Sequence, residues 1–407
     1  MHQHAVDAPR SRRAIFAVGV AAVAAAAVVA ATVAEASQMA PGNGYKPAGG
    51  WGKAGTANGQ FVNATGLAVD KRGNVYVADR DNNRIQVFSA KGAFLRKWGS
   101  IGSGEGQFTG ADDVAISQDG SVWVADDGGA RFQQFSASGA FQTAISVPGE
   151  LARGVAVDAN GNLLGAVEGS AKSGFRRYSS GSWSPSGGLF GGEAVMRADD
   201  IEASPDGSIY VIRGGTQGGG DWLERYSSGG QLLKKTKLAP GDGTRALAVD
   251  LDCNVLVSDW TGGTGFAKIA PSGKRLATGP ATAPVRDMVV GPKGDVYALL
   301  NGAGVARYAE NAAQPASAVV AGAVTVSGGV AKVRYTLAGV ACPAQVDAVA
   351  MLAGSVKGKA SVKVPAGKPT TLSIPAKGSS GKATFTIRLK TNGRPTTQTA
   401  SVSVTVR

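Results

Sequence analysis

The chain has 407 residues, of which 43% are hydrophobic and 17% are charged, and its formal net charge is +13. This length excludes a single small domain, and this hydrophobic content excludes a disordered chain. Two cysteines, Cys253 and Cys342, and two histidines are too few for a disulfide framework or a structural thiolate zinc site.

The N-terminus has the features of an export signal. Residues 14–34 contain no charged side chain, three arginines precede them, and 34–36 (Ala-Glu-Ala) form a small-x-small cleavage pattern. We expect residues 1–36 to be a signal peptide, with an uncleaved N-terminal membrane anchor as the alternative. Arg12 and Arg13 resemble a twin-arginine signal, and the general secretory route is the other possibility. We therefore expect a secreted or cell-surface protein.

Export limits the chemistry of the mature chain, because His2 and His4 precede the cleavage pattern and are the only histidines. Without imidazole the chain cannot form a Ser-His-Asp or Cys-His triad, a histidine general base or a histidine-bound catalytic zinc. An enzyme built on this chain would depend on carboxylates, Lys, Tyr or a bound hard cation.

Between residues 37 and 311 one segment recurs six times. Each copy has an alternating strand, a tight turn that in most copies ends in Gly, and a second strand, as in 66–79 (GLAVDKRGNVYVAD). The copies begin at Gly66, Asp113, Gly154, Asp200, Ala246 and Asp287. Their spacings of 47, 41, 46, 46 and 41 residues suit four short strands with turns. The sequence therefore predicts an all-β fold, a six-bladed β-propeller.

The sixth copy lacks a fourth strand before residue 310. A matching segment stands at the other end of the repeat region, where 50–52 (GWG) and 59–61 (GQF) repeat at an offset of 47 as 98–99 (WG) and 106–108 (GQF). We expect the N-terminal strand to complete the last blade and close the ring, because closure removes open sheet edges.

The first copy resembles the NHL repeat in the segments 59–61 (GQF), 66–70 (GLAVD), 73–79 (GNVYVAD), 83–88 (NRIQVF) and 92–94 (GAF). The resemblance extends with more variation over residues 45–310 and implies a six-bladed propeller in an exported, bacterial-type protein. NHL proteins include RNA-binding regulators, ubiquitin-ligase substrate modules, receptor-kinase sensor domains and a histidine- and metal-dependent lyase. Because the mature chain has no histidine, the lyase chemistry is not carried over, and without a RING-type cysteine cluster ligase activity is not carried over either.

The loops that enter the first strands are expected to surround one mouth of the central channel. Asp113, Asp200 and Asp287 take equivalent positions in alternate blades, 87 residues apart, which predicts a three-fold set of carboxylates. Arg153, Arg245 and Arg286 occupy positions from which they could neutralise this set. The predicted ligand-binding residues at the mouth are Asp112, Asp113, Arg153, Asp199, Asp200, Glu202, Arg245, Arg286 and Asp287.

Two interpretations of these carboxylates remain open. In the first, the mouth binds a polar ligand, or Asp113, Asp200, Glu202 and Asp287 hold a hard cation such as Ca²⁺. In the second, Asp–Arg pairs lock the blades together, because clustered like charges without partners would be costly. Glu202 is the strongest single candidate, because the other five copies have Ala or Val at its position. Its structural alternative is a salt bridge to an arginine of a neighbouring blade.

Other polar residues of the repeat have simpler interpretations. Asp79, Asp126 and Asp259 end the second strands and are expected to act as turn caps. Cys253 replaces the glycine of the blade-five turn, either as a turn residue or as an exposed thiol. Neither spacing nor context favours its pairing with Cys342.

The last quarter of the chain differs in pattern and in charge. Seven short alternating stretches with Gly and Pro turns predict an immunoglobulin-like β-sandwich at 312–407. Twelve basic residues and one acidic residue give this part a formal charge of +11, against +1 for residues 37–311. Outside the cytoplasm this asymmetry favours an anionic envelope polymer as partner and disfavours nucleic acid, although the basic face could also serve only solubility.

The sequence favours a non-enzymatic module without a required cofactor. We expect the propeller mouth to bind a protein or a small molecule, the basic domain to hold the molecule near an anionic surface, and the chain to act as a monomer. One alternative is a lactonase-like hydrolase in which carboxylates hold a divalent metal that activates water. The other is a structural scaffold of the envelope. Bound metal would distinguish the hydrolase from the other two.

Overall fold

The computed structural model describes residues 44–169, 174–184, 198–213, 221–238, 246–250, 252–259, 265–302 and 304–310, and the strands beyond residue 318 as backbone. The side chains of residues 198, 199 and 259 lie outside this description, as do Arg245 and the expected export segment. No helix in the described ranges is long and apolar enough to cross a membrane.

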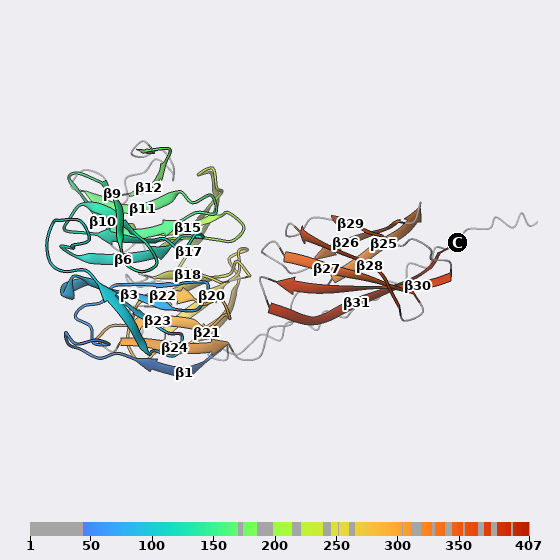
Figure 1. Ribbon diagram of the computed structural model, residues 1–407, viewed down its shortest axis with the longest axis horizontal. Coiled ribbons are helices and arrows are strands. Elements are labelled where there is room, and N and C mark those ends of the chain that lie inside the picture. The colour runs from blue at the N-terminus through green and yellow to red at the C-terminus, as the bar shows by residue number, and fades with distance from the viewer. Residues whose placement is uncertain are drawn as a thin grey trace, which may run out of the picture.

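Within residues 44–310, short runs rich in Val, Ile and aromatic residues, each ended by a turn, form six four-stranded antiparallel sheets (Figure 1). Blades one to three are β2(Gly66–Val69), β3(Val75–Asp79), β4(Arg84–Phe88) and β5(Phe94–Trp98); β6(Ala111–Ile116), β7(Val122–Asp126), β8(Arg131–Phe135) and β9(Phe141–Ser146); and β10(Glu150–Val157), β11(Leu163–Gly169), β12(Gly174–Ser179) and β13(Ser182–Trp183). Blades four to six are β14(Ala198–Ala203), β15(Ile209–Arg213), β16(Trp222–Tyr226) and β17(Leu232–Lys237); β18(Leu247–Val249), β19(Val255–Asp259), β20(Gly265–Ile269) and β21(Arg275–Gly279); and β22(Val285–Val290), β23(Val296–Leu300), β24(Gly304–Glu310) and β1(Tyr45–Trp51). A short 3-10 helix, η1(Arg80–Asn82), follows β3.

The first strands of the six blades form the inner ring. Each of β2, β6, β10, β14, β18 and β22 contacts the next, and β22 contacts β2. The sheets bury apolar clusters between neighbouring blades, as where Phe61, Val77 and Phe88 of the first blade region meet Leu299 and Val305 of the sixth. The predicted six-bladed propeller is confirmed.

The predicted closure is also confirmed, because β1 pairs antiparallel with β24 and completes the sixth sheet. Tyr45 lies opposite Glu310, and Trp51 lies opposite Val305. The Trp51 ring packs 5.8 Å from the ring of Phe88 in blade one, so that the closing strand also contacts the first blade. The repeated GQF segments form equivalent bridges, Ala54 with Phe61 and Ile101 with Phe108.

Side-chain hydrogen bonds shape the turns between the first and second strands. In blade one, Asp70 Oδ1 accepts hydrogen bonds from the backbone N–H groups of Arg72 (2.9 Å) and Asn74 (2.8 Å), and Gly73 has a φ of 84°. Asp250 makes the same contacts in blade five, where Cys253 has a φ of 60° in place of the glycine. The aspartate carboxylate thus fixes the turn even where a residue other than glycine has its backbone in the left-handed region.

Beyond residue 318 the described backbone forms a three-stranded sheet and a four-stranded sheet, in the orders β25-β26-β29 and β28-β27-β30-β31. Their strands are β25(Val319–Ser327), β26(Val330–Leu337), β27(Ala344–Leu352), β28(Ser355–Val364), β29(Thr370–Pro375), β30(Gly381–Thr391) and β31(Arg394–Val406). Each of the seven predicted stretches lies within one of these strands.

Candidate functional site

Bulges interrupt the register of four first strands. The strand register skips Asp112 in β6, Arg153 in β10, Asp199 in β14 and Arg286 in β22. A bulge places two residues opposite one and redirects a side chain. These four residues, expected in entering loops, therefore lie within strands. Each precedes a residue of the inner ring.

The three predicted carboxylates join the blades in pairs. Asp113 Oδ1 accepts from the N–H of Val114 and its Oδ2 accepts from the N–H of Val155 in blade three, both at 2.7 Å. Asp200 bonds the N–H of Ile201 (2.7 Å) and of Leu247 in blade five (2.8 Å) in the same way. Asp287 bonds the N–H of Met288 and of Leu67 in blade one. The set therefore links blades two to three, four to five and six to one.

In blades one, three and five, small residues occupy the position that an aspartate takes in blades two, four and six. A Cβ atom on Gly66 would lie 2.6 Å from the Cα of Asp113, a distance that side chains do not tolerate. Blade three has Gly154 and blade five has Ala246 at this position. The inner ring thus alternates between a carboxylate that bridges two blades and a small residue that makes room for its neighbour.

These carboxylates bind protons more tightly than ordinary aspartates. Burial raises the pKa of Asp113 to about 8, although two backbone hydrogen bonds act in the opposite direction. Burial, together with the charge of the facing carboxylates, raises the pKa values of Asp200 and Asp287 well above the usual range. The three carboxylates therefore lie close enough to raise one another's pKa values, and their oxygens accept hydrogen bonds from backbone N–H groups.

Glu202 lies near this set, on β14. Burial raises its pKa to about 7, and its Oε2 accepts a 3.1 Å hydrogen bond from the N–H of Ala203. Its charge contributes to the raised pKa values of all three aspartates. Among the described ion pairs none includes Glu202, and Arg245 of the neighbouring blade five lies outside the described residues, so the salt-bridge alternative stays a prediction.

The donor geometry does not favour a hard cation at this ring. Within the described residues no three Asp, Glu, His or Cys side chains converge as a metal-binding group. Asp113, Asp200 and Asp287 each direct both carboxylate oxygens at backbone N–H groups, whereas Ca²⁺ requires six to eight oxygen ligands. We therefore derive no metal chemistry here.

The expected arginine partners lie elsewhere on the mouth. Arg153 bonds Asp127 Oδ2 (2.8 Å) and Glu168 Oε2 (3.0 Å), and Arg80 reaches Asp127 Oδ2 (2.6 Å) and Asp112 Oδ1 (3.1 Å). Burial raises the pKa of Asp112 to about 6 despite these arginines. The interpretation in which Arg153 neutralises Asp113, Asp200 and Asp287 is therefore wrong. The sequence does not predict that Arg80, Asp127 and Glu168 take part in this network. The repeat offset of 47 residues, which relates residue 80 to residue 127, was the one signal for Arg80 and Asp127 in the sequence.

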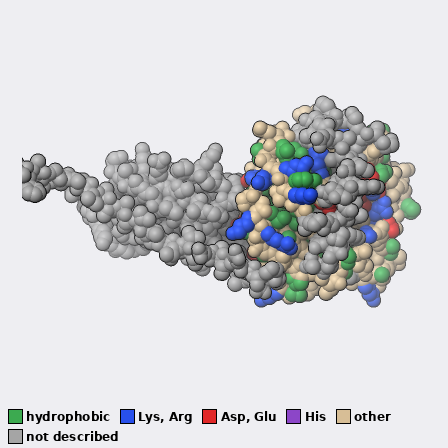
Figure 2. Space-filling view, turned by 180° about the vertical axis from the view of Figure 1, so that it is seen from behind, with side chains coloured by type: hydrophobic (Ala, Val, Ile, Leu, Met, Phe, Trp, Pro, Cys, Tyr) green, Lys and Arg blue, Asp and Glu red, His purple; other side chains and the backbone are tan. Residues whose placement is uncertain are grey.

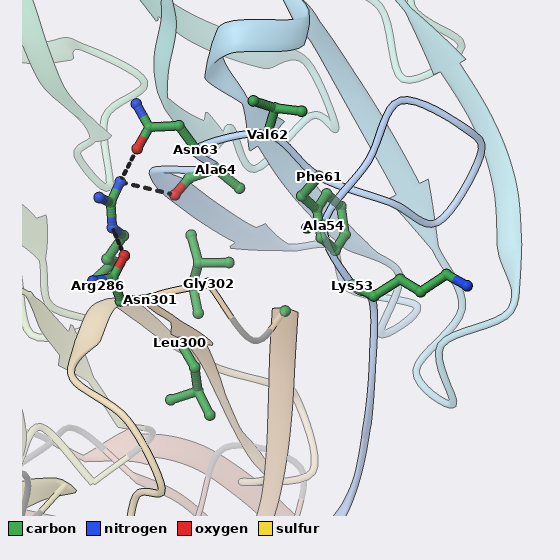
Figure 3. A pocket seen from close by; sticks show the side chains of 12 residues that line it. Lys53, Ala54, Phe61, Val62, Asn63, Ala64, Arg286, Leu300, Asn301 and Gly302 are labelled. Carbon is green, nitrogen blue, oxygen red and sulfur yellow. Dashed lines mark hydrogen bonds between the residues drawn. The ribbon is translucent and has the colours of Figure 1, made fainter.

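A pocket of about 180 Å³ opens at the mouth between blades six and one. Phe61, Val62, Leu299 and Leu300 line its apolar walls. Arg286 closes one side, where its Nε donates to Asn301 Oδ1 (3.0 Å) and its Nη1 donates to Asn63 Oδ1 (Figure 3). Figure 3 shows the Lys53 side chain extending away from this polar edge. Of the predicted residues that the structure describes, only Arg286 lines the pocket.

The repeat signature residues build a buried network under the mouth. Arg84 Nε donates to Asp79 Oδ2 (2.7 Å), and its Nη atoms donate to the carbonyl oxygens of Thr56, Ala57 and Gln60. Arg131 and Asp126 repeat this arrangement in blade two. Asp79 and Asp126 are therefore members of buried ion pairs rather than simple turn caps. The side chain of Asp259 lies outside the described residues.

Cys253 is fully buried and disulfide-bonded. The exposed-thiol interpretation is therefore wrong, and the residue has no reactive thiol. Cys342, the other cysteine of the sequence, lies outside the described residues.

Comparison with known proteins supports the repeat and the fold. Residues 61–88 match the sequence profile of the NHL repeat. Protein lin-41 of Caenorhabditis elegans is 47% identical over 47 residues, which are 12% of this chain and 4% of that protein. E3 ubiquitin-protein ligase TRIM71 of Bos taurus is 47% identical over 51 residues, 12% of this chain and 6% of that protein. These segments span a small part of the relatives, so the similarity concerns the repeat.

Several solved structures resemble this chain at low identity. A gluconolactonase from Xanthomonas campestris has a TM-score of 0.51 at 12% identity and covers 67% of this chain and 99% of its own. Virginiamycin B lyase from Staphylococcus aureus has a TM-score of 0.43 at 14% identity, over 67% and 91% of the two chains. A calcium-binding regucalcin from Agrobacterium tumefaciens has a TM-score of 0.48 at 14% identity, over 63% and 94%.

Proposed function

We propose that this protein is an exported, non-enzymatic binding module. Its propeller mouth recognises a protein or a small ligand, and a basic immunoglobulin-like C-terminal sandwich holds it near an anionic envelope polymer. The observation that carries the proposal is the pocket between blades six and one, where apolar walls meet a polar edge of Arg286, Asn63 and Asn301. Such a combination anchors an apolar group and orients it by hydrogen bonds.

The pocket volume indicates the kind of ligand. Sites for drug-sized molecules measure roughly 300–1,000 Å³, whereas this pocket holds about 180 Å³. That volume suits one apolar side chain of a protein partner or a small fragment of a ligand. The Arg286 guanidinium and the two asparagine amides at the edge can bond the carbonyl or carboxylate groups next to such a side chain.

Capture from envelope fractions tests the mouth. The mature chain, beginning at residue 37, is immobilised beside two variants, Arg286→Ala and Arg72→Ala. Arg72 is exposed on the turn between β2 and β3 and lines no part of the pocket, so it is the matched control. We expect a partner that wild type and Arg72→Ala retain and Arg286→Ala loses. Equal capture by all three chains would contradict recognition at this pocket.

Metal content tests the hydrolase alternative. Elemental analysis and thermal melting with Ca²⁺ or EDTA are compared for wild type and Glu202→Ala. The carboxylate oxygens of Asp113 and Asp200 already accept hydrogen bonds from backbone N–H groups. We therefore expect no stoichiometric metal and no change of melting temperature with Ca²⁺ or EDTA. A bound divalent ion that Glu202→Ala loses would overturn the non-enzymatic proposal and favour a lactonase-like activity.

Cosedimentation with purified cell wall tests the basic domain. A formal charge of +11 at residues 312–407 should give an association that weakens steeply as salt rises. Association independent of salt, or none at low salt, would contradict an electrostatic role for this domain.

A further inference from the structure

The outer strands of blades four and five carry cations beside exposed leucines. Residues of β17 and of the turn and strand around β21 contribute to this basic–leucine patch, which comprises Leu232, Leu233, Lys234, Lys235, Lys237, Lys274, Arg275 and Leu276. Leu232, Leu233 and Leu276 are 46%, 50% and 37% exposed. Few other leucines in the described part of the propeller are as exposed as these three.

Blades four and five adjoin within this patch at Lys234 and Thr236, whereas Lys235 and Lys237 lie on the other face of β17. A Cβ atom on Gly273, in the turn before β21, would lie 3.7 Å from Cε of Lys234 and 3.3 Å from Oγ1 of Thr236 on β17. The turn of blade five therefore adjoins the outer strand of blade four. Figure 2 shows Lys and Arg side chains gathered beside hydrophobic ones on one face of the propeller.

Most of the positive charge in the patch is not neutralised. Lys235 Nζ pairs with Glu224 Oε1 at 3.0 Å, but within the described residues Lys234, Lys237, Lys274 and Arg275 form no ion pair. The ammonium groups of Lys235 and Lys237 lie 4.8 and 5.9 Å from the ring centre of Trp222, which is partly exposed. The patch thus combines cations, leucines and an indole ring at its edge.

We infer that the basic–leucine patch binds the surface of an anionic lipid bilayer. Cations of this kind are attracted to anionic headgroups, and apolar side chains beside them enter the headgroup region. A purely polar polymer would leave the three leucines in water. The C-terminal domain of the same chain is an unsuitable occupant, because its charge of +11 repels the patch. This inference goes beyond the mouth and the polymer-binding domain of the proposed function.

Lysines on an outermost strand have a competing explanation, which is that they prevent pairing of the strand edge with another chain. That role predicts self-association when the lysines are removed and predicts no affinity for lipid. It also gives no reason for the exposed leucines. A lipid-binding experiment therefore separates the two explanations.

The chain offers a matched control in blade one. Leu95 occupies the position on β5 that Leu233 occupies on β17, and it is 46% exposed next to cationic residues. The mature chain is compared with the variants Leu233→Ser/Lys234→Gln and Leu95→Ser/Lys97→Gln in sedimentation with phosphatidylglycerol vesicles and with phosphatidylcholine vesicles. We expect the blade-four variant to bind phosphatidylglycerol about tenfold more weakly and the blade-one variant to bind as wild type.

Brominated phosphatidylglycerol distinguishes this patch from binding by the C-terminal domain. Bromine quenches an indole only at short range, so quenching that disappears in Trp222→Phe while sedimentation persists places blade four at the bilayer. Binding without quenching of Trp222, equal binding by both double variants, or equal binding to both lipids would overturn the inference. Self-association of the blade-four variant with unchanged lipid binding would overturn it in favour of edge protection.

Discussion

At the residue scale, Arg84 shows how a side chain near the surface can act as a buried support. It is 7% exposed, its partner Asp79 is fully buried, and its guanidinium holds three carbonyl oxygens of the loop before blade one. Removal of the arginine leaves a buried carboxylate without its cation, which is more costly than the loss of an exposed pair.

We therefore predict that Arg84→Ala lowers the free energy of unfolding by about 3–5 kcal/mol, measured by urea unfolding. Arg72→Ala is the control, because Arg72 is exposed and should change stability by less than about 0.5 kcal/mol. Comparable effects of the two substitutions would show that the Arg84 network does not support the blade.

For Asp113, Asp200 and Asp287, the sequence predicts the set of residues but not the groups that they contact. The spacing of 87 residues places Asp113, Asp200 and Asp287 in one set, and the structure confirms that set. The partners could not be predicted, because they are backbone N–H groups that carry no sequence signal. The bulges at Asp112, Arg153 and Arg286 likewise have no signal in the sequence.

At the element scale, the closing strand β1 joins the two ends of the repeat region. It covers the edge of β24, and Lys268 of β20 bonds both Glu310 on β24 and Asp250, 2.8 Å from each. This buried lysine lies 6.0 Å from the ring of Tyr45 on β1. Closure therefore depends on pairing, aromatic packing and a buried cation together.

Removal of β1 should expose an unpaired sheet edge. We predict that a chain beginning at residue 53 melts at a clearly lower temperature than a chain beginning at residue 44 and forms larger species on size-exclusion chromatography. The longer chain is the matched control, because it lacks the preceding segment but keeps β1. Identical melting of both chains would mean that the sixth blade is stable with three strands.

Closure and blade number were predictable because they depend on patterns that repeat. The offset of 47 between the GQF segments locates β1, and alternating apolar residues locate most strands. The mouth pocket was not predictable, because Phe61, Leu300 and Arg286 come from the two ends of the repeat region and meet only after the ring closes. The propeller could thus be derived from local periodicity, whereas the candidate site depends on the assembled ring.

At the scale of the whole molecule, four carboxylates from three blades make stability depend on pH. The pKa values are about 8 for Asp113 and about 7 for Glu202, and they are raised well above the usual range for Asp200 and Asp287. An unfolded chain binds these protons only below about pH 4. The folded state therefore holds more protons between about pH 4 and pH 8, so the free energy of unfolding falls as pH rises through this range.

Two substitutions separate charge from hydrogen bonding in this ring. In Glu202→Gln the amide oxygen can still accept from the N–H of Ala203, but the side chain no longer ionises. We predict that Glu202→Gln is more stable than wild type at pH 8 and that this difference shrinks as the pH falls to about 4, measured by thermal melting in matched buffers. In Asp113→Asn an N–H₂ group must face one of two backbone N–H donors, which costs about 1–3 kcal/mol at both pH values. If Glu202→Gln were no more stable than wild type at pH 8, ionised Glu202 would have to be stabilised by a group that the described residues do not supply.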